Sequence, residues 1–105
     1  MKMYTNESQT AKLMELGFEE PTSAIVETIE YCDGKGLAIG HQDVIKDCNF
    51  NIGELIEMLG VHLSSIYYIK IGFWVVNAEG FEYRNDELID ALYDMIIKLK
   101  EEGVI

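Results

Sequence analysis

The chain has 105 residues and is strongly acidic, since nineteen Asp and Glu against eight Lys and Arg give a formal net charge of −11. This length fits one domain, and 49% hydrophobic residues with a single proline indicate an ordered core. The charge argues against direct binding to nucleic acid or to an anionic membrane, because both repel a polyanion. No apolar run reaches the roughly 18 residues of a membrane span. The first residues also lack the apolar stretch of a secretory signal, so we expect a cytoplasmic protein.

The first predicted element is a short helix over residues 5–16. Asn6 and Gln9 have the spacing of a capping box, in which each side chain accepts from the other residue's backbone N–H. Gly17 suits the left-handed position that ends many helices, and Phe18 can fold back on Leu13. We therefore expect a capped helix with a narrow apolar stripe.

A pair of strands is predicted next. Residues 23–32 alternate apolar and polar side chains, as a half-buried strand does. Residues 33–36 read Asp-Gly-Lys-Gly, a strong turn signal, and residues 37–39 are predicted to be the returning strand. Residues 41–50 fit either a strand edge or one turn of helix, so their structure stays open.

A second short helix begins at Asn51, which forms another capping box with Glu54 and precedes a closing Gly60. Its apolar stripe consists of Leu55, Ile56 and Leu59.

The longest β-like stretch spans residues 66–84, and the rest of the fold is expected to cover it. One row of alternate residues is wholly apolar, and we predict that it faces the core: Tyr67, Ile69, Ile71, Phe73 and Val75. Lys70 and Gly72 interrupt the other row. Residues 77–80 predict a turn, and residues 81–83 a second strand.

The last predicted helix is capped by Asn85 and closed by Gly103, with Asp94 and Lys98 as an ion pair one turn apart. Its broad apolar stripe indicates burial against a sheet, and contains Leu88, Leu92, Met95, Ile96 and Leu99.

These elements predict a single α+β domain over residues 1–105. We expect a mainly antiparallel sheet of about four strands with the helices on one face, in the order α-β-β-α-β-β-α.

Catalytic, cofactor-binding and metal-binding residues are not predicted anywhere in the chain. Cys32, His41, Cys48 and His62 lack the close pairs that zinc sites usually show. No triad signature, phosphate-binding loop or dinucleotide fingerprint occurs. A Cys–His nucleophile pair stays open as an alternative, because such residues meet only in space. We therefore expect a protein that is not an enzyme and needs no cofactor.

A candidate interface follows from the second row of the long strand. Tyr68, Trp74 and Val76 would project away from the helices, and aromatic residues are enriched at interface centres. We predict a homodimer or a protein-partner site centred on Trp74. The alternative is that residues 41–50 fold over this face and bury it within the monomer.

Four carboxylates form a candidate acidic ridge on the last helix: Asp86, Glu87, Asp90 and Asp94. If the charge imitates nucleic acid, these groups should lie on one exposed surface. Three classes of function follow. The leading one is a non-enzymatic protein-interaction or accessory module, the second is an acidic nucleic-acid mimic that inhibits a host protein, and the third is a small Cys or His enzyme.

Several stretches of the chain resemble those of uncharacterised small acidic proteins from Bacteroides-type bacteria and their phages or mobile elements. They are TNESQTAKLMELGFEEPTSA, NIGELIEMLG, the aromatic strand pair and DELIDALYDMIIKLKEEGVI. The chain departs from that group at Phe50-Asn51, where a tryptophan is common. The resemblance implies an α+β accessory protein and carries over no catalytic residue.

Overall fold

The computed structural model describes the backbone of residues 1–21, 24–32 and 38–105, and the side chains outside residues 22–48. The elements follow in the order α1 (Glu7–Glu15), β1 (Ala24–Cys32), β2 (Ala38–Cys48), α2 (Ile52–Leu59), a 3₁₀ turn (Gly60–His62), β3 (Leu63–Ile69), β4 (Phe73–Ala78), β5 (Phe81–Asn85) and α3 (Leu88–Glu101). The fold is α+β and every strand pair is antiparallel, as predicted. The prediction of one sheet of about four strands is wrong, and so is the predicted order α-β-β-α-β-β-α, because three strands and not two lie between α2 and α3. β1 and β2 form a two-stranded sheet, while β3, β4 and β5 form a separate one in that order.

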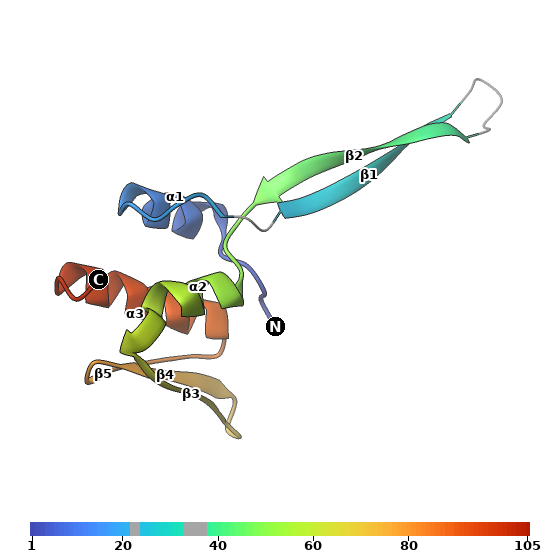
Figure 1. The fold of residues 1–105 in the computed structure, drawn as a ribbon. Coiled ribbons are helices and arrows are strands. Elements are labelled where there is room, and N and C mark those ends of the chain that lie inside the picture. The colour runs from blue at the N-terminus through green and yellow to red at the C-terminus, as the bar shows by residue number, and fades with distance from the viewer. Residues whose placement is uncertain (22–23, 33–37) are drawn as a thin grey trace.

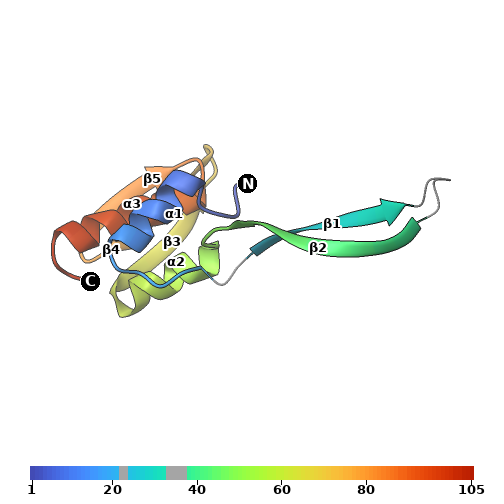
Figure 2. The same cartoon turned by 90° about the horizontal axis from the view of Figure 1, so that it is seen from above.

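The β1–β2 hairpin forms an arm that projects from the rest of the molecule, which we call the body (Figures 1 and 2). The molecule measures 63 × 35 × 21 Å, and its radius of gyration is 18.1 Å. A compact chain of this length would have a radius of gyration of about 13 Å. β2 also settles the open stretch, because residues 41–48 continue the strand and do not fold over the other sheet. The predicted turn at 33–36 lies outside the described residues.

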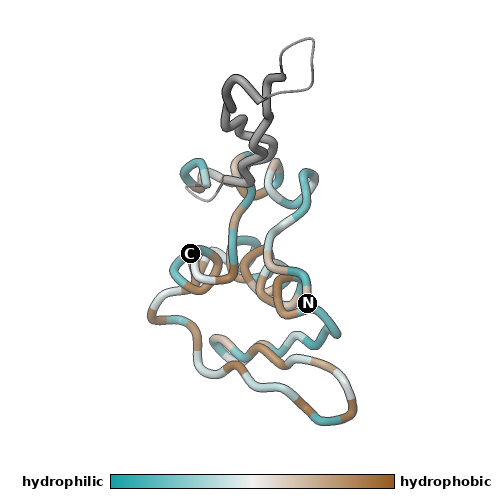
Figure 3. The backbone as a smooth tube through the Cα atoms, turned by 90° about the vertical axis from the view of Figure 1, so that its right-hand side faces the viewer, coloured by the Kyte–Doolittle hydropathy of each residue, from teal (hydrophilic) through white to brown (hydrophobic). Residues whose placement is uncertain are grey.

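The body has three layers, with α1 stacked on α3, and α2 and α3 covering one face of the β3–β4–β5 sheet (Figures 1 and 2). Hydrophobic segments run through both the helices and the sheet (Figure 3). The core joins all three layers and contains Leu13, Phe50, Leu55, Leu59, Val76, Ala78, Leu88, Ile89, Ala91, Leu92, Met95, Ile96 and Leu99. The prediction that the last helix buries its apolar stripe against a sheet is confirmed.

The two short helices begin with the predicted capping boxes. Asn6 Oδ1 accepts from the Gln9 backbone N–H at 2.8 Å, and Gln9 Oε1 accepts from the Asn6 N–H at 3.0 Å. Asn51 and Glu54 form the same reciprocal pair at 2.8 and 3.2 Å. Each box satisfies backbone donors that the helix itself leaves without a partner.

The ends of α1 and α3 also follow the prediction. Gly17 has a φ of 101°, and the Phe18 N–H donates to the Leu13 carbonyl at 3.2 Å. Gly103 has a φ of 73°, and the equivalent bond after it is 2.9 Å long. This geometry turns the chain back towards the helix and gives hydrogen-bond donors to the last carbonyl groups of the helix.

The long strand predicted at residues 66–76 is broken by a tight turn at residues 70–72. The Gly72 N–H donates to the Ile69 carbonyl at 2.9 Å, and Gly72 has a φ of 112°. Three-residue hairpin loops commonly place a glycine at a positive φ in this position. The chain therefore reverses here, and β3 and β4 pair with each other in place of one extended strand.

The faces of this sheet are the reverse of those predicted. Val76 and Ala78 are fully buried in the core shared with the helices, and Trp74 packs against that core. On the predicted core row, Val75 is fully buried, as predicted, but it does not belong to the core shared with the helices. Tyr67 is 45% exposed, and Ile71, which lies in the turn, is 81% exposed. The row that contains Tyr67 therefore lies on the side of the sheet away from the helices.

The start of α3 also differs from the prediction. Asn85 ends β5, and its side-chain oxygen accepts from the Glu87 backbone N–H at 2.9 Å, so the helix begins at Leu88. Lys98 pairs with Glu102 at 3.0 Å, and not with Asp94.

Candidate functional site

The candidate binding site is an open pocket of about 440 Å³ that combines aromatic and acidic side chains. We call it the aromatic pocket, and it is lined by Met1, Tyr68, Trp74, Asp86 and Glu87. The structure thus brings together two of the predicted interface residues and two of the predicted ridge residues. The register of the sheet explains why, since Asn85 is the partner of Trp74 on β5 and the next two residues leave the strand beside it.

Tyr68 and Trp74 form the aromatic wall of this pocket. They are directly opposite each other on β3 and β4, with ring centroids 5.1 Å apart and planes tilted by 55°. Tilted aromatic pairs at this separation are favourable beyond the area they bury. Trp74 also packs against the core, whereas Tyr68 is 53% exposed. The pair is therefore anchored on one side and accessible on the other.

Asp86 and Glu87 supply the negative charge. Asp86 is exposed, and Glu87 is half-buried at the N-cap position of α3. Glu87 Oε2 accepts from the Lys2 backbone N–H at 2.7 Å, which fixes this carboxylate beside the N-terminal segment. Carboxylates next to electron-rich ring faces favour a cation, because both attract positive charge.

The carboxylate of Asp90 forms hydrogen bonds with residues of the N-terminal segment and of α1. Its Oδ1 accepts from Lys2 Nζ and from Gln9 Nε2, each at 2.8 Å. Burial tends to raise the pKa of Asp90, but the hydrogen bonds from Lys2 and Gln9 and the charge of Lys2 outweigh it and hold that pKa below its usual value.

Asp94 is half-buried, and its pKa is raised by burial and then by the nearby charge of Asp90. The four predicted ridge carboxylates therefore do not form one exposed row, since Asp86 alone is exposed among them. Val76 is likewise not an interface residue of the folded chain, because it is fully buried in the core.

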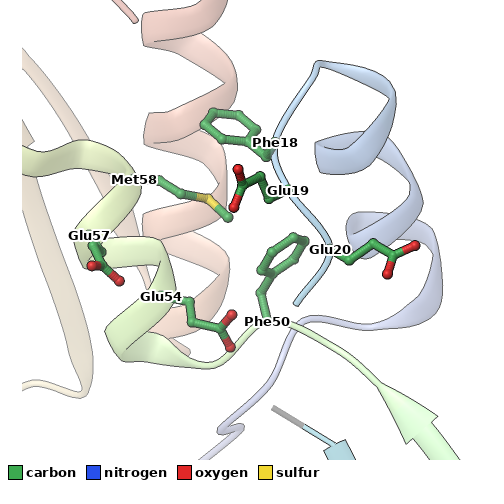
Figure 4. Close-up of a pocket in the computed structure, with 7 residues that line it drawn as sticks. All are labelled: Phe18, Glu19, Glu20, Phe50, Glu54, Glu57 and Met58. Carbon is green, nitrogen blue, oxygen red and sulfur yellow. The ribbon is translucent and has the colours of Figure 1, made fainter. Parts of the chain in front are cut away.

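A second, smaller pocket lies between α2 and the segment that follows α1 (Figure 4). It has a volume of about 270 Å³ and is lined by Phe18, Glu19, Glu20, Phe50, Glu54, Glu57 and Met58. This volume is below the range of about 300–1,000 Å³ typical of small-molecule sites. Neither segment carries a signal for it in the sequence, because the pocket arises only when two distant segments pack together.

The described part of the structure does not show a cluster of side chains that could bind a metal ion. No group of three or more such side chains occurs among the described residues. His62 Nδ1 lies 2.8 Å from Glu79 Oε1, while the side chains of Cys32, His41 and Cys48 lie outside the described residues.

Among the described residues, no helix has the length and apolar character needed to cross a membrane. No family model, no curated protein and no solved structure matches the chain. Function is therefore inferred from the pockets and surfaces themselves.

Proposed function

We propose that the chain is a non-enzymatic protein-interaction module whose aromatic pocket binds a lysine- or arginine-bearing segment of a partner protein. The observation that carries this proposal is the pair of exposed Tyr68 and half-buried Trp74 beside Asp86 and Glu87. The resemblance to small acidic accessory proteins is compatible with such a role.

The chemistry of the pocket favours an organic cation. A guanidinium or ammonium group over a tryptophan or tyrosine face gains about 0.5–2 kcal/mol, depending on how well it is desolvated. Asp86 and Glu87 add direct charge attraction at the pocket edge. The net charge of −11 would also accelerate encounter with a basic partner at low salt.

The geometry of the pocket supports binding of a cationic segment better than it supports nucleic-acid binding or nucleic-acid mimicry. Aromatic platforms that stack on bases are combined with a positively charged groove, whereas this pocket carries carboxylates. Mimicry needs an exposed series of negative groups, and three of the four predicted ridge residues are half-buried.

The single tryptophan of the chain provides a direct test. The fluorescence of Trp74 should change saturably on titration with a short Arg-Gly-Ser peptide, and the response should weaken as salt is raised. A peptide with glutamine in place of arginine should give no response. We expect affinities near the millimolar range, because one pocket contacts one side chain.

Two variants locate the binding site. Tyr68→Ala and Asp86→Asn should each weaken binding of the arginine peptide several-fold, since both side chains are exposed in the pocket. Ile71→Ala is the matched control, because it removes an exposed apolar side chain from the turn after β3. Equal affinity for the wild type and both pocket variants would refute the proposal.

A further inference from the structure

The outer edge of β3 is free of charge, in contrast to most of the molecule. β3 is an edge strand of the three-stranded sheet and reads LSSIYYI, without a single charged residue or proline. Ser64, Ser65, Tyr67 and Tyr68 are all exposed. Edge strands leave a row of backbone N–H and C=O groups open to pairing, and proteins usually block such edges with charges, prolines or bulges.

The opposite edge of the same sheet has the usual protection. β5 carries Glu82 and Arg84, both exposed, with Arg84 Nε 3.0 Å from Glu82 Oε2. On β3, the register shift between Leu63 and Ser65 is an irregularity at the start of the strand. Residues 65–69 pair with β4 in unbroken register and present a regular edge.

We propose that β3 pairs with β3 of a second copy of the chain, antiparallel and centred on Tyr67, to make a continuous six-stranded sheet. A two-fold axis perpendicular to the sheet generates this arrangement and keeps the helices of both copies on one face. This proposal does not depend on the proposed binding of a cationic segment.

The residues of β3 are complementary to themselves in this register. Tyr67 lies opposite Tyr67 of the second copy, Ile66 opposite Tyr68, and Ser65 opposite Ile69. Aromatic–aromatic and aromatic–β-branched pairs are among the favourable cross-strand neighbours. The two residues of each opposed pair also project from the same face of the combined sheet, because their numbers are either both odd or both even.

Charge favours a second copy at this edge over other modes of self-association. Two chains that each carry −11 repel each other, so a stable contact must bring together segments without carboxylates. Residues 63–69 are such a segment. The pairing residues are uncharged in both copies, so no like charges are directly opposed.

Sedimentation equilibrium in 0.5 M salt, where repulsion is largely screened, tests the proposal directly. We expect a concentration-dependent dimer of the wild type. Tyr67→Lys should abolish it by placing two lysines opposite each other, although this change lowers the negative charge and would favour any non-specific association. Met14→Lys is the matched control on exposed α1 surface and should keep the dimer. A wild type that stays monomeric, or a Tyr67→Lys dimer, would overturn the proposal.

Cysteine cross-linking gives a second measurement that does not depend on a disruptive variant. In a Cys32→Ser, Cys48→Ser background, Tyr67→Cys should form a covalent dimer on mild oxidation, because directly opposed Cβ atoms lie about 4.5–5.5 Å apart. Ile71→Cys is more exposed but lies away from the axis, and should cross-link poorly. Equal cross-linking of both variants would indicate random collision and contradict the proposed register.

Discussion

Replacing Asp90 with asparagine should destabilise the folded chain, because it removes the charge that holds the N-terminal segment on α3. Asp90 Oδ1 accepts from Lys2 Nζ and Gln9 Nε2, each at 2.8 Å. Asp90 also lies in the first turn of α3, where the helix dipole favours a negative group. Asparagine keeps the shape and an acceptor oxygen, so the variant isolates the contribution of the charge.

The expected loss is about 1 kcal/mol. Hydrogen bonds to a charged group contribute about 1.5–3 kcal/mol, and exposed ion pairs about 0–1 kcal/mol. The Lys2 and Asp90 side chains are 30% and 26% exposed, so solvent screening places the value between these ranges. For a domain of this size, a loss of 1 kcal/mol lowers the melting temperature by about 4–8 °C.

Asp94→Asn is the matched control, one helical turn further along α3. Burial and the charge of Asp90 raise the pKa of Asp94, so its ionised form is unfavourable in the folded state. At pH 7 this variant should leave stability unchanged or slightly increased. Thermal unfolding followed by circular dichroism compares the two variants, and equal destabilisation by both would refute the assignment of opposite electrostatic roles.

The pH dependence of stability should separate the two carboxylates further. The folded-state pKa of Asp90 lies below 3.8, so its contribution is complete above pH 3.8 and is lost as pH falls through that lowered pKa. The folded-state pKa of Asp94 lies above 3.8, so its effect on stability improves as pH falls through the raised pKa towards 3.8. The difference between wild type and Asp90→Asn should therefore vanish in strong acid. A difference that persists there would mean that charge is not its cause.

The remaining predictions concern the core and two glycines. Thr10→Val should cost about 1–3 kcal/mol in urea unfolding, because buried Thr10 Oγ1 lies 2.7 Å from Thr5 Oγ1 and 2.6 Å from Asn49 Oδ1; Thr10→Ser should restore most of the loss. Leu13→Ala should cost about 2–5 kcal/mol, since Leu13 is fully buried in the core, and a loss below 1 kcal/mol would contradict that packing. Gly72→Ala should destabilise by about 1 kcal/mol because its φ is 112°. Gly53→Ala should instead stabilise the chain by up to about 1 kcal/mol, because Gly53 lies in α2 and the new Cβ would be 3.4 Å from the nearest atom. Thermal unfolding should show a lower melting temperature for Gly72→Ala and a higher one for Gly53→Ala.

The helix ends could be predicted from the sequence because their signals are local. Asn6 with Gln9 needs only four consecutive residues to form a capping box, and the structure has it. The glycine that ends a helix also acts within one turn of it, as Gly17 and Gly103 do. Such interactions form in nearly the same way whatever packs around them.

The sequence pattern assigns the wrong face of the sheet to the core because Lys70 and Gly72 look like strand residues that interrupt the even-numbered row. Both belong to the turn between β3 and β4, so neither is evidence against burial of their row. Without them, the even-numbered positions from Ile66 to Ala78 that pair with a neighbouring strand are all apolar or aromatic. All of them except the exposed Tyr68 belong to the core or pack against it. Residues 70–72, Lys-Ile-Gly, have the length and the glycine of a three-residue hairpin loop between two apolar runs, but the unbroken odd-numbered row conceals this signal.

The aromatic pocket was predictable only in part. Tyr68 and Trp74 share a face by sequence spacing, but they become neighbours only because the turn at residues 70–72, which was not predicted, places them opposite each other on β3 and β4. Asp86 reaches the same place through the pairing of Asn85 with Trp74, which depends on two successive hairpins. The hydrogen bonds of Lys2 with Glu87 and Asp90 join positions more than 80 residues apart, so no local sequence pattern predicts them.

The projecting arm implies that the chain unfolds in more than one cooperative unit. β1 and β2 contact each other extensively, and no extensive contact joins either strand to another described element. The free energy that holds the arm together therefore comes from pairing within the arm, and opening it leaves the core of the body intact. Amide hydrogens of residues 24–32 and 38–48 should exchange through this local opening, while those of α3 should exchange only when the whole body unfolds.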